Sequence, residues 1–250
     1  APAFFFSLPR IFSVVPLAGG CFVCGEKIMK PFVVCHMMAS LDGRIDCAMT
    51  EYLGSKTYYA VLDELACDTM VEGKTTAVMH YAEPGVFTGG NETSVGEPCF
   101  FKASDSETWH VVTDTKGTLL WPETTEKSRL CLVSEKASRG YLDYLKCRGI
   151  SYIAVGKGAI DLEKALEMLV EHFGTKRMAV VGGGHINGSF LREGLLDEVS
   201  IVYGPGIDGR SSFATAFEGI PKGHEEPYHL KLITAKVMQE DAVWLRYQVK

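Results

Sequence analysis

The sequence predicts a three-layer α/β/α domain with a central, mostly parallel sheet and a C-terminal antiparallel hairpin. Two observations lead to this fold class. Short apolar runs alternate with amphipathic stretches over most of the chain, which is typical of strands joined by helical crossovers. The last two apolar runs, 228–238 and 243–249, flank a polar turn containing Glu240 and Asp241, which is typical of a hairpin.

The first half of the chain opens with a continuous apolar run at 32–37, which fits a strand buried on both faces. Apolar residues then recur at helical spacing from Ser55, a candidate N-cap, as far as residue 66. A short strand is predicted at 69–71, and it runs into Gly73. Residues 82–107 are rich in glycine and proline and are predicted to form a long surface loop.

The second half has a more regular pattern. Strands are predicted at 109–113, 129–133, 152–155, 178–181 and 198–202. Helices are predicted at 138–148 and 161–173, and Asp161 stands at the start of the second one. This β-α-β-α-β series implies right-handed crossovers and a parallel sheet.

Composition excludes several classes of protein. With 46% hydrophobic and 22% charged residues, the 250-residue chain can bury a sizeable core. A net charge of -6 argues against nucleic-acid and anionic-membrane partners, which need a broad basic surface. The eight cysteines are too few for a disulfide scaffold, and the pair Cys21 and Cys24 has no second pair at zinc spacing. We therefore predict no metal and a reduced, cytoplasmic protein.

Residues 1–28 read differently from the rest. They are rich in phenylalanine, proline and glycine, and the uncharged stretch 11–25 is shorter than the roughly 20 residues that span a bilayer. A lipoprotein-type processing site ending at Cys21 is an alternative, but no basic start precedes it. We interpret 1–28 as an extension of doubtful structural role, and 29–250 as a single domain.

Two glycine loops follow predicted strands. In the first, Gly73 and Lys74 suggest a triphosphate loop, but Asp68 stands where that loop needs its first glycine. In the second, 182–188, a Rossmann fingerprint requires glycine where Asn187 stands. Consecutive glycines still let the backbone approach a ligand, and the helix N-terminus that follows attracts phosphate. Tight turns alone explain one such loop equally well, whereas two loops favour a dinucleotide site.

Three motifs in order give the chain a family resemblance. They are Pro31-Phe32-Val33-Val34 followed by Ala39-Ser40-Leu41-Asp42-Gly43-Arg44-Ile45, then Gly73-Lys74-Thr75-Thr76, then Val180-Val181-Gly182-Gly183-Gly184 with Gly194-Leu195-Leu196-Asp197-Glu198 and Gly204-Pro205-Gly206-Ile207-Asp208-Gly209. From Pro31 to the C-terminus the chain resembles the stand-alone riboflavin-biosynthesis pyrimidine reductases (RibD C-terminal domain). The resemblance implies a dihydrofolate-reductase-like fold that transfers a hydride from NADPH to a C=N or C=O group.

The resemblance also implies a set of cofactor contacts. Gly73, Lys74 and Thr76 are expected at the phosphates, with Lys74 in place of the usual arginine beside the adenosine 2′-phosphate. The second loop is expected at the pyrophosphate or the nicotinamide ribose. The full predicted set is Ala39, Gly73, Lys74, Thr76, Ser134, Gly182, Gly183, Gly184, Ile186 and Asn187.

On the substrate side, the resemblance points to Ser40 and Asp42, with Gly54 and Ser55 further along the rim. Asp42 is the predicted catalytic residue, because a carboxylate near the hydride acceptor orients an amino group or relays a proton. A simple turn-forming role before a glycine is the alternative for Asp42. His36 and His185 are interpreted as structural. We expect Trp109, Trp121 and Trp244 to pack in the core or at a subunit contact.

The sequence thus predicts an NADPH-dependent reductase of a small polar heterocycle, pyrimidine- or pterin-like. Val181 stands where pyrimidine reductases usually carry glutamate, which favours a different substrate. Two alternatives stay open: the riboflavin-pathway diaminohydroxyphosphoribosylaminopyrimidine reductase itself, and a non-catalytic dinucleotide-binding protein. A homodimer is predicted through the C-terminal hairpin, where Val243, Leu245 and Tyr247 alternate.

Overall fold

The structure is a computed structural model that describes residues 29–45, 47–123 and 128–250. The predicted extension 1–28, with Cys21 and Cys24, lies outside the described residues. Within the described ranges, no helix is both long enough and apolar enough to cross a membrane.

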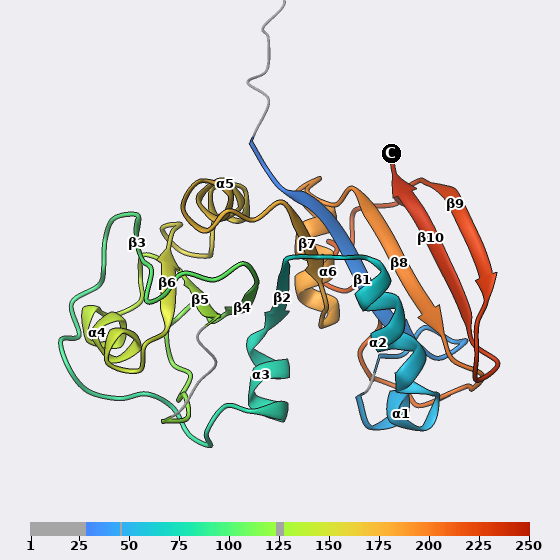
Figure 1. The fold of residues 1–250 in the computed structure, drawn as a ribbon, viewed down its shortest axis with the longest axis horizontal. Coiled ribbons are helices and arrows are strands. Elements are labelled where there is room, and N and C mark those ends of the chain that lie inside the picture. The colour runs from blue at the N-terminus through green and yellow to red at the C-terminus, as the bar shows by residue number, and fades with distance from the viewer. Residues whose placement is uncertain (1–28, 46, 124–127) are drawn as a thin grey trace, which may run out of the picture.

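A ten-stranded sheet runs through the described part of the chain (Figure 1). Its strands are β1 (Phe32–Ala39), β2 (Thr69–Gly73), β3 (Cys99–Phe101), β4 (Trp109–Thr113), β5 (Arg129–Val133), β6 (Ser151–Ala154), β7 (Arg177–Val180), β8 (Glu198–Tyr203), β9 (Leu230–Val237) and β10 (Val243–Val249). Their order is β3-β6-β5-β4-β2-β7-β1-β8-β10-β9. All neighbours from β6 to β8 are parallel, whereas β3, β9 and β10 pair antiparallel. The predicted mostly parallel sheet with a C-terminal hairpin is confirmed.

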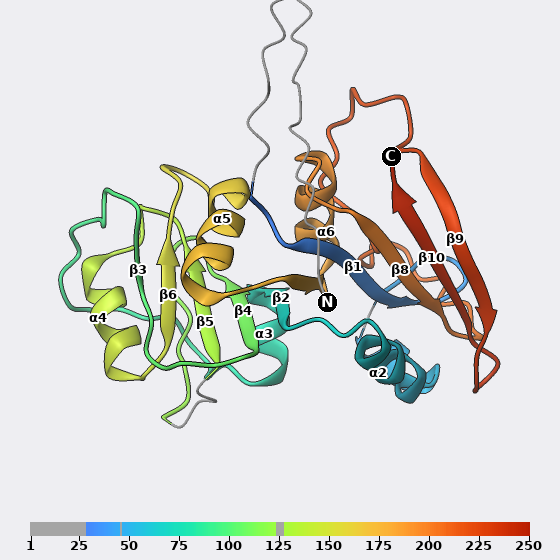
Figure 2. The same ribbon diagram turned by 45° about the horizontal axis from the view of Figure 1, so that its top comes forward.

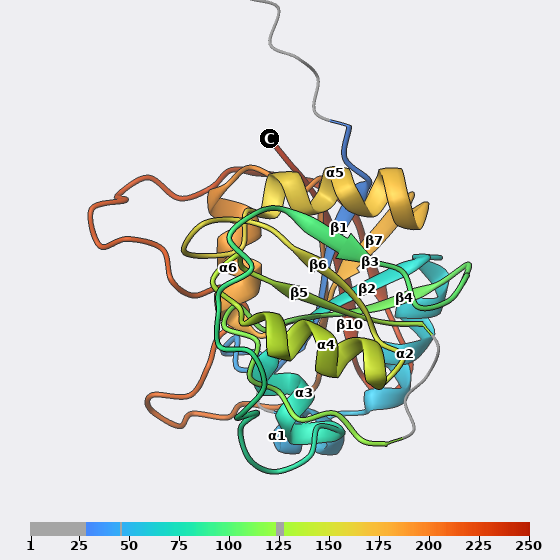
Figure 3. The same ribbon diagram turned by 90° about the vertical axis from the view of Figure 1, so that its left-hand side faces the viewer.

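Helices cover both faces of this sheet, which gives the predicted three layers (Figures 2 and 3). They are α1 (Cys47–Tyr52), α2 (Ser55–Glu64), α3 (Lys74–His80), α4 (Arg139–Cys147), α5 (Leu162–Phe173) and α6 (Gly184–Arg192). Alternate residues of β1 show the division: Val33 and Cys35 share a core with α5 and α6, whereas Val34 packs with α2. On the same side as α2, the buried residues of α3 and α4 pack on β4, β5 and β6.

The three tryptophans belong to three different core clusters. Trp109 packs with α5, Trp121 with α4, and Trp244 with α2, and each is at most 1% exposed. Full burial of such large side chains removes much apolar surface from water, which is the main stabilising contribution to a core. The prediction that they pack in the core is confirmed.

Two local predictions are wrong. Ser55 is not the N-cap of α2: that position belongs to Gly54, whose left-handed φ of 96° suits glycine, and no side chain caps the helix. The segment 82–107 is not a continuous loop, because Cys99–Phe101 forms β3 against β6. The pairing partner of such a short strand lies about 50 residues away, so local sequence does not reveal it. Asp161 caps α5 as expected, its carboxylate accepting from the Lys164 N–H at 3.1 Å.

Candidate active site

A cleft of about 690 Å³ opens at the carboxyl ends of the parallel strands. Its walls come from the residues that follow β2, β4 and β7, together with short segments at 159–162 and 213–218. Ligands of open α/β sheets bind outside the carboxyl ends of the strands, so the cleft has the position expected of a binding site.

The two predicted glycine loops meet in this cleft. The backbone N–H of Gly73 donates to the Gly182 carbonyl at 2.9 Å, which continues the parallel pairing of β2 with β7. Residues from both loops line the cleft: Gly73, Lys74, Thr75, Thr76, Gly183, Gly184, His185 and Ile186. The shared crevice that the sequence predicts is therefore present.

Two of these glycines have open space where a side chain would stand. Gly73 and Gly183 have ordinary extended backbones, with φ of -84° and -78°. A methyl group at Gly183 would meet no protein atom within 4 Å, and one at Gly73 would be in normal contact at 3.7 Å. In contrast, Gly182 has φ of 105°, and a methyl at Gly184 would lie 2.3 Å from the Thr215 carbonyl. The bare backbone at Gly73 and Gly183 thus leaves room in the cleft for a ligand.

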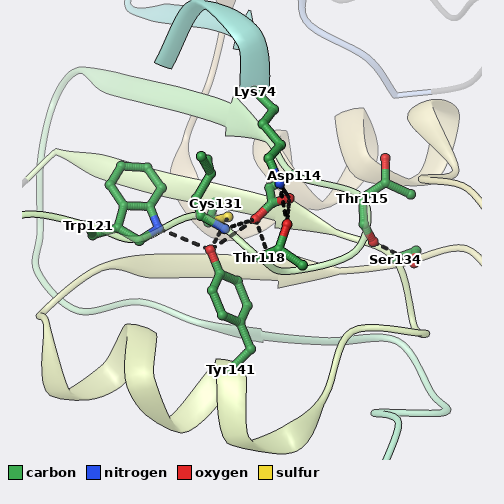
Figure 4. A network of polar contacts seen from close by, with 9 residues as sticks. Lys74, Asp114, Thr115, Thr118, Trp121, Cys131, Ser134 and Tyr141 are labelled. Atoms are coloured by element: carbon green, nitrogen blue, oxygen red, sulfur yellow. Dashed lines mark hydrogen bonds and ion pairs between the residues drawn. The ribbon is translucent and has the colours of Figure 1, made fainter. Parts of the chain in front are cut away.

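One end of the cleft holds a lysine and a buried carboxylate (Figure 4). Lys74 begins α3 and Asp114 follows β4, and the sheet brings them together because β2 and β4 are neighbours. The Lys74 Nζ lies 3.4 Å from Asp114 Oδ1 and donates to the Thr118 hydroxyl. Asp114 is 1% exposed and Lys74 is 41% exposed, so the carboxylate is fixed in the wall while the ammonium reaches the opening.

The opposite end is built by loops. The segments that follow β1 and β8 join where the Ile45 N–H donates to the Ala214 carbonyl at 3.2 Å. Further along, the Glu218 N–H donates to the Gly184 carbonyl at 2.9 Å, which fixes this segment to the start of α6. The Glu218 carboxylate accepts from the Thr215 N–H and lies 3.5 Å from Nε2 of His185. This end therefore carries an acid–histidine pair whose imidazole is 82% exposed.

Ser40 and Asp42 form a closed hydrogen-bonded turn. The Ser40 hydroxyl donates to Asp42 at 2.6 Å, and the N–H groups of Asp208 and Gly209 donate to the same carboxylate. The Ser40 hydroxyl, and then these two amides, hold the pKa of Asp42 well below its usual range. Asp42 is consequently ionised near neutral pH, which suits a hydrogen-bond acceptor better than a proton donor. Neither residue is among those that line the cleft.

Gly54 and Ser55, the other predicted substrate contacts, also lie away from the lining. A methyl at Gly54 would lie 2.5 Å from the Glu240 carboxylate, which places this corner beside the turn between β9 and β10. The structure does not bring Gly54 and Ser55 to the two glycine loops.

Six of the ten predicted cofactor contacts line the cleft: Gly73, Lys74, Thr76, Gly183, Gly184 and Ile186. The other four, Ala39, Ser134, Gly182 and Asn187, are not among the lining residues. The Ser134 hydroxyl donates to the Thr115 carbonyl at 2.7 Å (Figure 4), and Ala39 is buried at the end of β1. The Asn187 amide donates to the Ala216 carbonyl at 2.7 Å, so it supports the 213–218 segment.

The two histidines that the sequence predicts to be structural, His36 and His185, lie in different surroundings. His36 is fully buried: its Nδ1 lies 3.0 Å from the Ser200 hydroxyl and its Nε2 lies 3.2 Å from the Tyr58 carbonyl. Burial lowers the pKa of His36 from 6.5 to about 4, so the ring is neutral near pH 7. His185, in contrast, lies in the wall of the cleft.

Sequence reasoning missed five charged residues of the cleft: Asp114, Lys116, Arg192, Glu193 and Glu218. A signal for Asp114 was available, because it directly follows a strand of a parallel sheet, and such strands end at one edge. No comparable signal marks Glu218, which lies in a loop well past the end of β8.

Comparison with known proteins agrees with this fold. A model of the family described as the RibD C-terminal domain matches residues 31–244. The chain belongs to the RibD C-terminal domain family. The match includes both glycine loops, Asp114 and Glu218, and it ends within β10.

Two curated relatives are named as 2,5-diamino-6-ribosylamino-4(3H)-pyrimidinone 5′-phosphate reductases. The protein from Aquifex aeolicus is 26% identical over 209 residues, covering 76% of this chain and 84% of that protein. The protein from Methanothermobacter thermautotrophicus is 26% identical over 233 residues, covering 89% of this chain and all of the relative. Because these relatives and this chain share a reductase family, the predicted oxidoreductase class is confirmed.

Solved structures show the same fold. A pyrimidine reductase-like protein from Corynebacterium diphtheriae superposes with a TM-score of 0.67 at 16% identity, covering 88% of this chain and 92% of that one. A riboflavin biosynthesis reductase from Saccharomyces cerevisiae gives 0.55 at 19% identity, covering 90% and 92%.

Reductases of the riboflavin pathway use a nicotinamide cofactor, and the cleft of this family member fits one. The fit rests on the open space at Gly73 and Gly183, which side chains would fill. It also rests on α6, whose N-terminus has no side-chain cap and therefore leaves the positive end of the helix dipole open to a phosphate.

Proposed function

We propose that this protein is an NADPH-dependent reductase of a pyrimidine-like substrate and that the cleft between the two glycine loops binds the cofactor. The observation that carries the proposal is the pair Gly73 and Gly183. Both glycines lie in the cleft wall, and a Cβ at either would come no closer than 3.7 Å to any protein atom beyond its chain neighbours. Bare backbone that faces open space is consistent with close approach by a diphosphate.

The charges along the cleft support one orientation of the cofactor. Gly183 and the N-terminus of α6 would hold the pyrophosphate, and Lys74 and Lys116 would hold the adenosine 2′-phosphate. The nicotinamide then points toward Ile45, Phe213 and Glu218. When bound there, it supplies the hydride, and the protein positions the acceptor and limits access of water.

Glu218 is the proposed substrate-binding carboxylate. The relatives named above act on a diaminopyrimidinone, whose amino groups are hydrogen-bond donors that a carboxylate accepts. Val181 stands where the family usually carries a glutamate, and it is not among the lining residues, whereas Glu218 is. In this chain Glu218 would supply the carboxylate from another segment. This supports the same substrate class for this chain. His185, whose Nε2 lies 3.5 Å from the Glu218 carboxylate, is the proposed donor of the proton that a reduction also needs.

The test of the cofactor site is a set of glycine-to-alanine variants. Gly73→Ala and Gly183→Ala should each weaken NADPH binding at least about tenfold, because the methyl group occupies the space proposed for the ligand. Gly223→Ala is the matched control, since a methyl there also meets no protein atom within 4 Å and the residue lies outside the cleft. Fluorescence titration gives the affinity, and thermal unfolding shows whether each variant is folded.

The proposal fails if the wild-type protein binds neither NADPH nor NADH at millimolar concentration. It also fails if both cleft variants bind NADPH as tightly as Gly223→Ala does. Turnover with the diaminopyrimidinone ribosyl phosphate, followed by NADPH oxidation, tests the substrate class.

We also propose a cytoplasmic homodimer that pairs through β9. This strand forms one edge of the sheet, and Leu232, Ile233 and Val237 on it are 53%, 49% and 86% exposed. Exposed apolar edges favour pairing with another strand. Light scattering should give a dimer for the wild type and a monomer for Ile233→Lys combined with Val237→Lys; a monomeric wild type at micromolar concentration would remove the proposal.

A further inference from the structure

The carboxylate of Asp114 stands in the cleft wall beside the lysine to which the proposed function assigns the 2′-phosphate. We propose that Asp114 lowers the preference of this enzyme for NADPH over NADH, measured as the ratio of the two affinities. This inference rests on the proposed function, since it requires that the cleft bind a nicotinamide dinucleotide with its adenosine end at Lys74.

The two oxygens of Asp114 have separate roles (Figure 4). Oδ2 accepts from the N–H groups of Thr118 and Leu119, at 2.5 and 2.7 Å, and from the Tyr141 hydroxyl at 3.1 Å. Oδ1 contacts the Thr118 hydroxyl at 3.4 Å and the Lys74 Nζ at 3.4 Å. The first oxygen therefore shapes the turn after β4, and the second carries the contact with Lys74.

The carboxylate is held in place from behind. Tyr141 is fully buried, and the Trp121 indole N–H donates to its hydroxyl oxygen at 3.1 Å. Burial raises the pKa of Tyr141 far above its usual value, so the phenol stays a neutral donor to Asp114. Asp114 is therefore fixed, whereas the Lys74 side chain is 41% exposed and can adjust when a ligand arrives.

A fixed negative charge at this place affects the two cofactors differently. A 2′-phosphate attracted to Lys74 also comes close to Asp114, so repulsion offsets part of the attraction. The 2′-hydroxyl of NADH carries no charge and is a donor that a carboxylate can accept, as acidic residues do in NAD-binding folds. The lysine favours NADPH and the aspartate opposes it, which leaves NADPH only weakly preferred over NADH.

Asp114→Asn isolates this effect. The amide oxygen can take over the three bonds of Oδ2, while the amide nitrogen replaces the charged Oδ1 beside Lys74. We expect the ratio of NADPH to NADH affinity to rise about tenfold, as expected from removing one charge a few ångströms from a phosphate. The rise should come from tighter NADPH binding together with weaker NADH binding, and titration without substrate should show the same ratio.

Two variants complete the experiment. Lys74→Gln should lower the NADPH to NADH ratio about tenfold, because it removes the attracting charge. Tyr141→Phe removes a neutral bond to the same carboxylate and should leave the ratio within about twofold. Thermal unfolding of all three variants reports whether the fold is kept.

An unchanged or lower ratio in folded Asp114→Asn would overturn the inference, since it would mean that Asp114 does not oppose the phosphate. If Asp114→Asn does not fold, the wild type and Lys74→Gln still test the inference. A weak wild-type preference for NADPH that falls further in Lys74→Gln supports the balance of charges. A strict wild-type preference for NADPH contradicts it. These outcomes differ from failure of the proposed function, in which the wild type binds neither cofactor.

Discussion

The two ends of the cleft are built in different ways. At the Lys74 end, the functional groups follow neighbouring strands directly, and a buried network of hydrogen bonds holds Asp114. At the Glu218 end, Glu218 comes from the loop after β8, which a few backbone bonds join to its neighbours, and its partner His185 on α6 is 82% exposed. Rigid strand ends suit a cofactor that a whole family shares, whereas loops are where binding specificity varies.

Gly188→Ala is expected to give the largest difference between the two ends of the cleft. A methyl at Gly188 would lie 1.8 Å from the Glu218 carbonyl oxygen, so the 213–218 segment must move away from α6. Displacing the substrate end should lower kcat/KM about 100-fold or more. NADPH affinity should change far less, because the displaced segment packs on Gly188, whereas the proposed cofactor contacts Lys74 and Gly183 lie elsewhere in the cleft wall.

Steady-state kinetics and NADPH titration of Gly188→Ala, beside Gly223→Ala as control, measure the two ends separately. Equal losses at both ends would contradict the comparison, because they would mean that α6 moves rather than the loop.

A smaller and sharper effect is expected from Glu218→Gln. The amide oxygen can still accept from the Thr215 N–H, so the loop should keep its shape while the charge and the pairing with His185 are lost. We expect kcat/KM to fall about ten- to a hundredfold, the usual value of a hydrogen bond to a charged group. The dissociation constant of NADPH should stay within about twofold of the wild type. Loss of NADPH binding would instead place Glu218 at the cofactor.

The smallest effect concerns the strands beneath the Glu218 end. His36 of β1 contacts Ser200 of β8, and its pKa is about 4 in the folded protein against 6.5 normally. Between these values the unfolded chain binds the additional proton, so the contribution of neutral His36 to stability is complete above pH 6.5 and is lost as the pH falls toward 4. At pH 5.5 the loss should reach about 1.4 kcal/mol relative to pH 7.5, one pKa unit of free energy.

Urea unfolding at both pH values, for the wild type and His36→Gln, measures this difference. Glutamine can keep both hydrogen bonds but does not titrate, so its stability should depend less on pH. Identical pH dependence of the free energy of unfolding in the two proteins would show that His36 does not contribute to it.

Much of the candidate site could be predicted from the sequence because it is encoded locally. Apolar runs mark where most of the strands lie along the chain, and the glycines after two of them mark backbone that faces open space, as at Gly73 and Gly183. Lys74 follows from the same local motif. The family model matches the region in which these motifs occur.

The substrate side was predicted less well, for a physical reason. Asp42 was chosen from its neighbours in sequence, yet its carboxylate is occupied by the amides of Asp208 and Gly209, some 166 residues away. Gly54 was chosen as next along the rim, but it lies beside Glu240 instead. Loop conformations depend on partners distant in sequence, and hydrophobic periodicity contains no information about them.

By itself, then, the sequence determined the layers, the parallel sheet and the two backbone bends that meet in the cleft, because each depends on short-range pattern and on the handedness of crossovers. Only the tertiary structure decided which charges stand in the cleft. Asp114 and Lys74 become neighbours through the register of β2 with β4, and Glu218 reaches the opposite end because its loop packs on Gly184 and Gly188. Charges act through distance in space, which the folded chain alone sets.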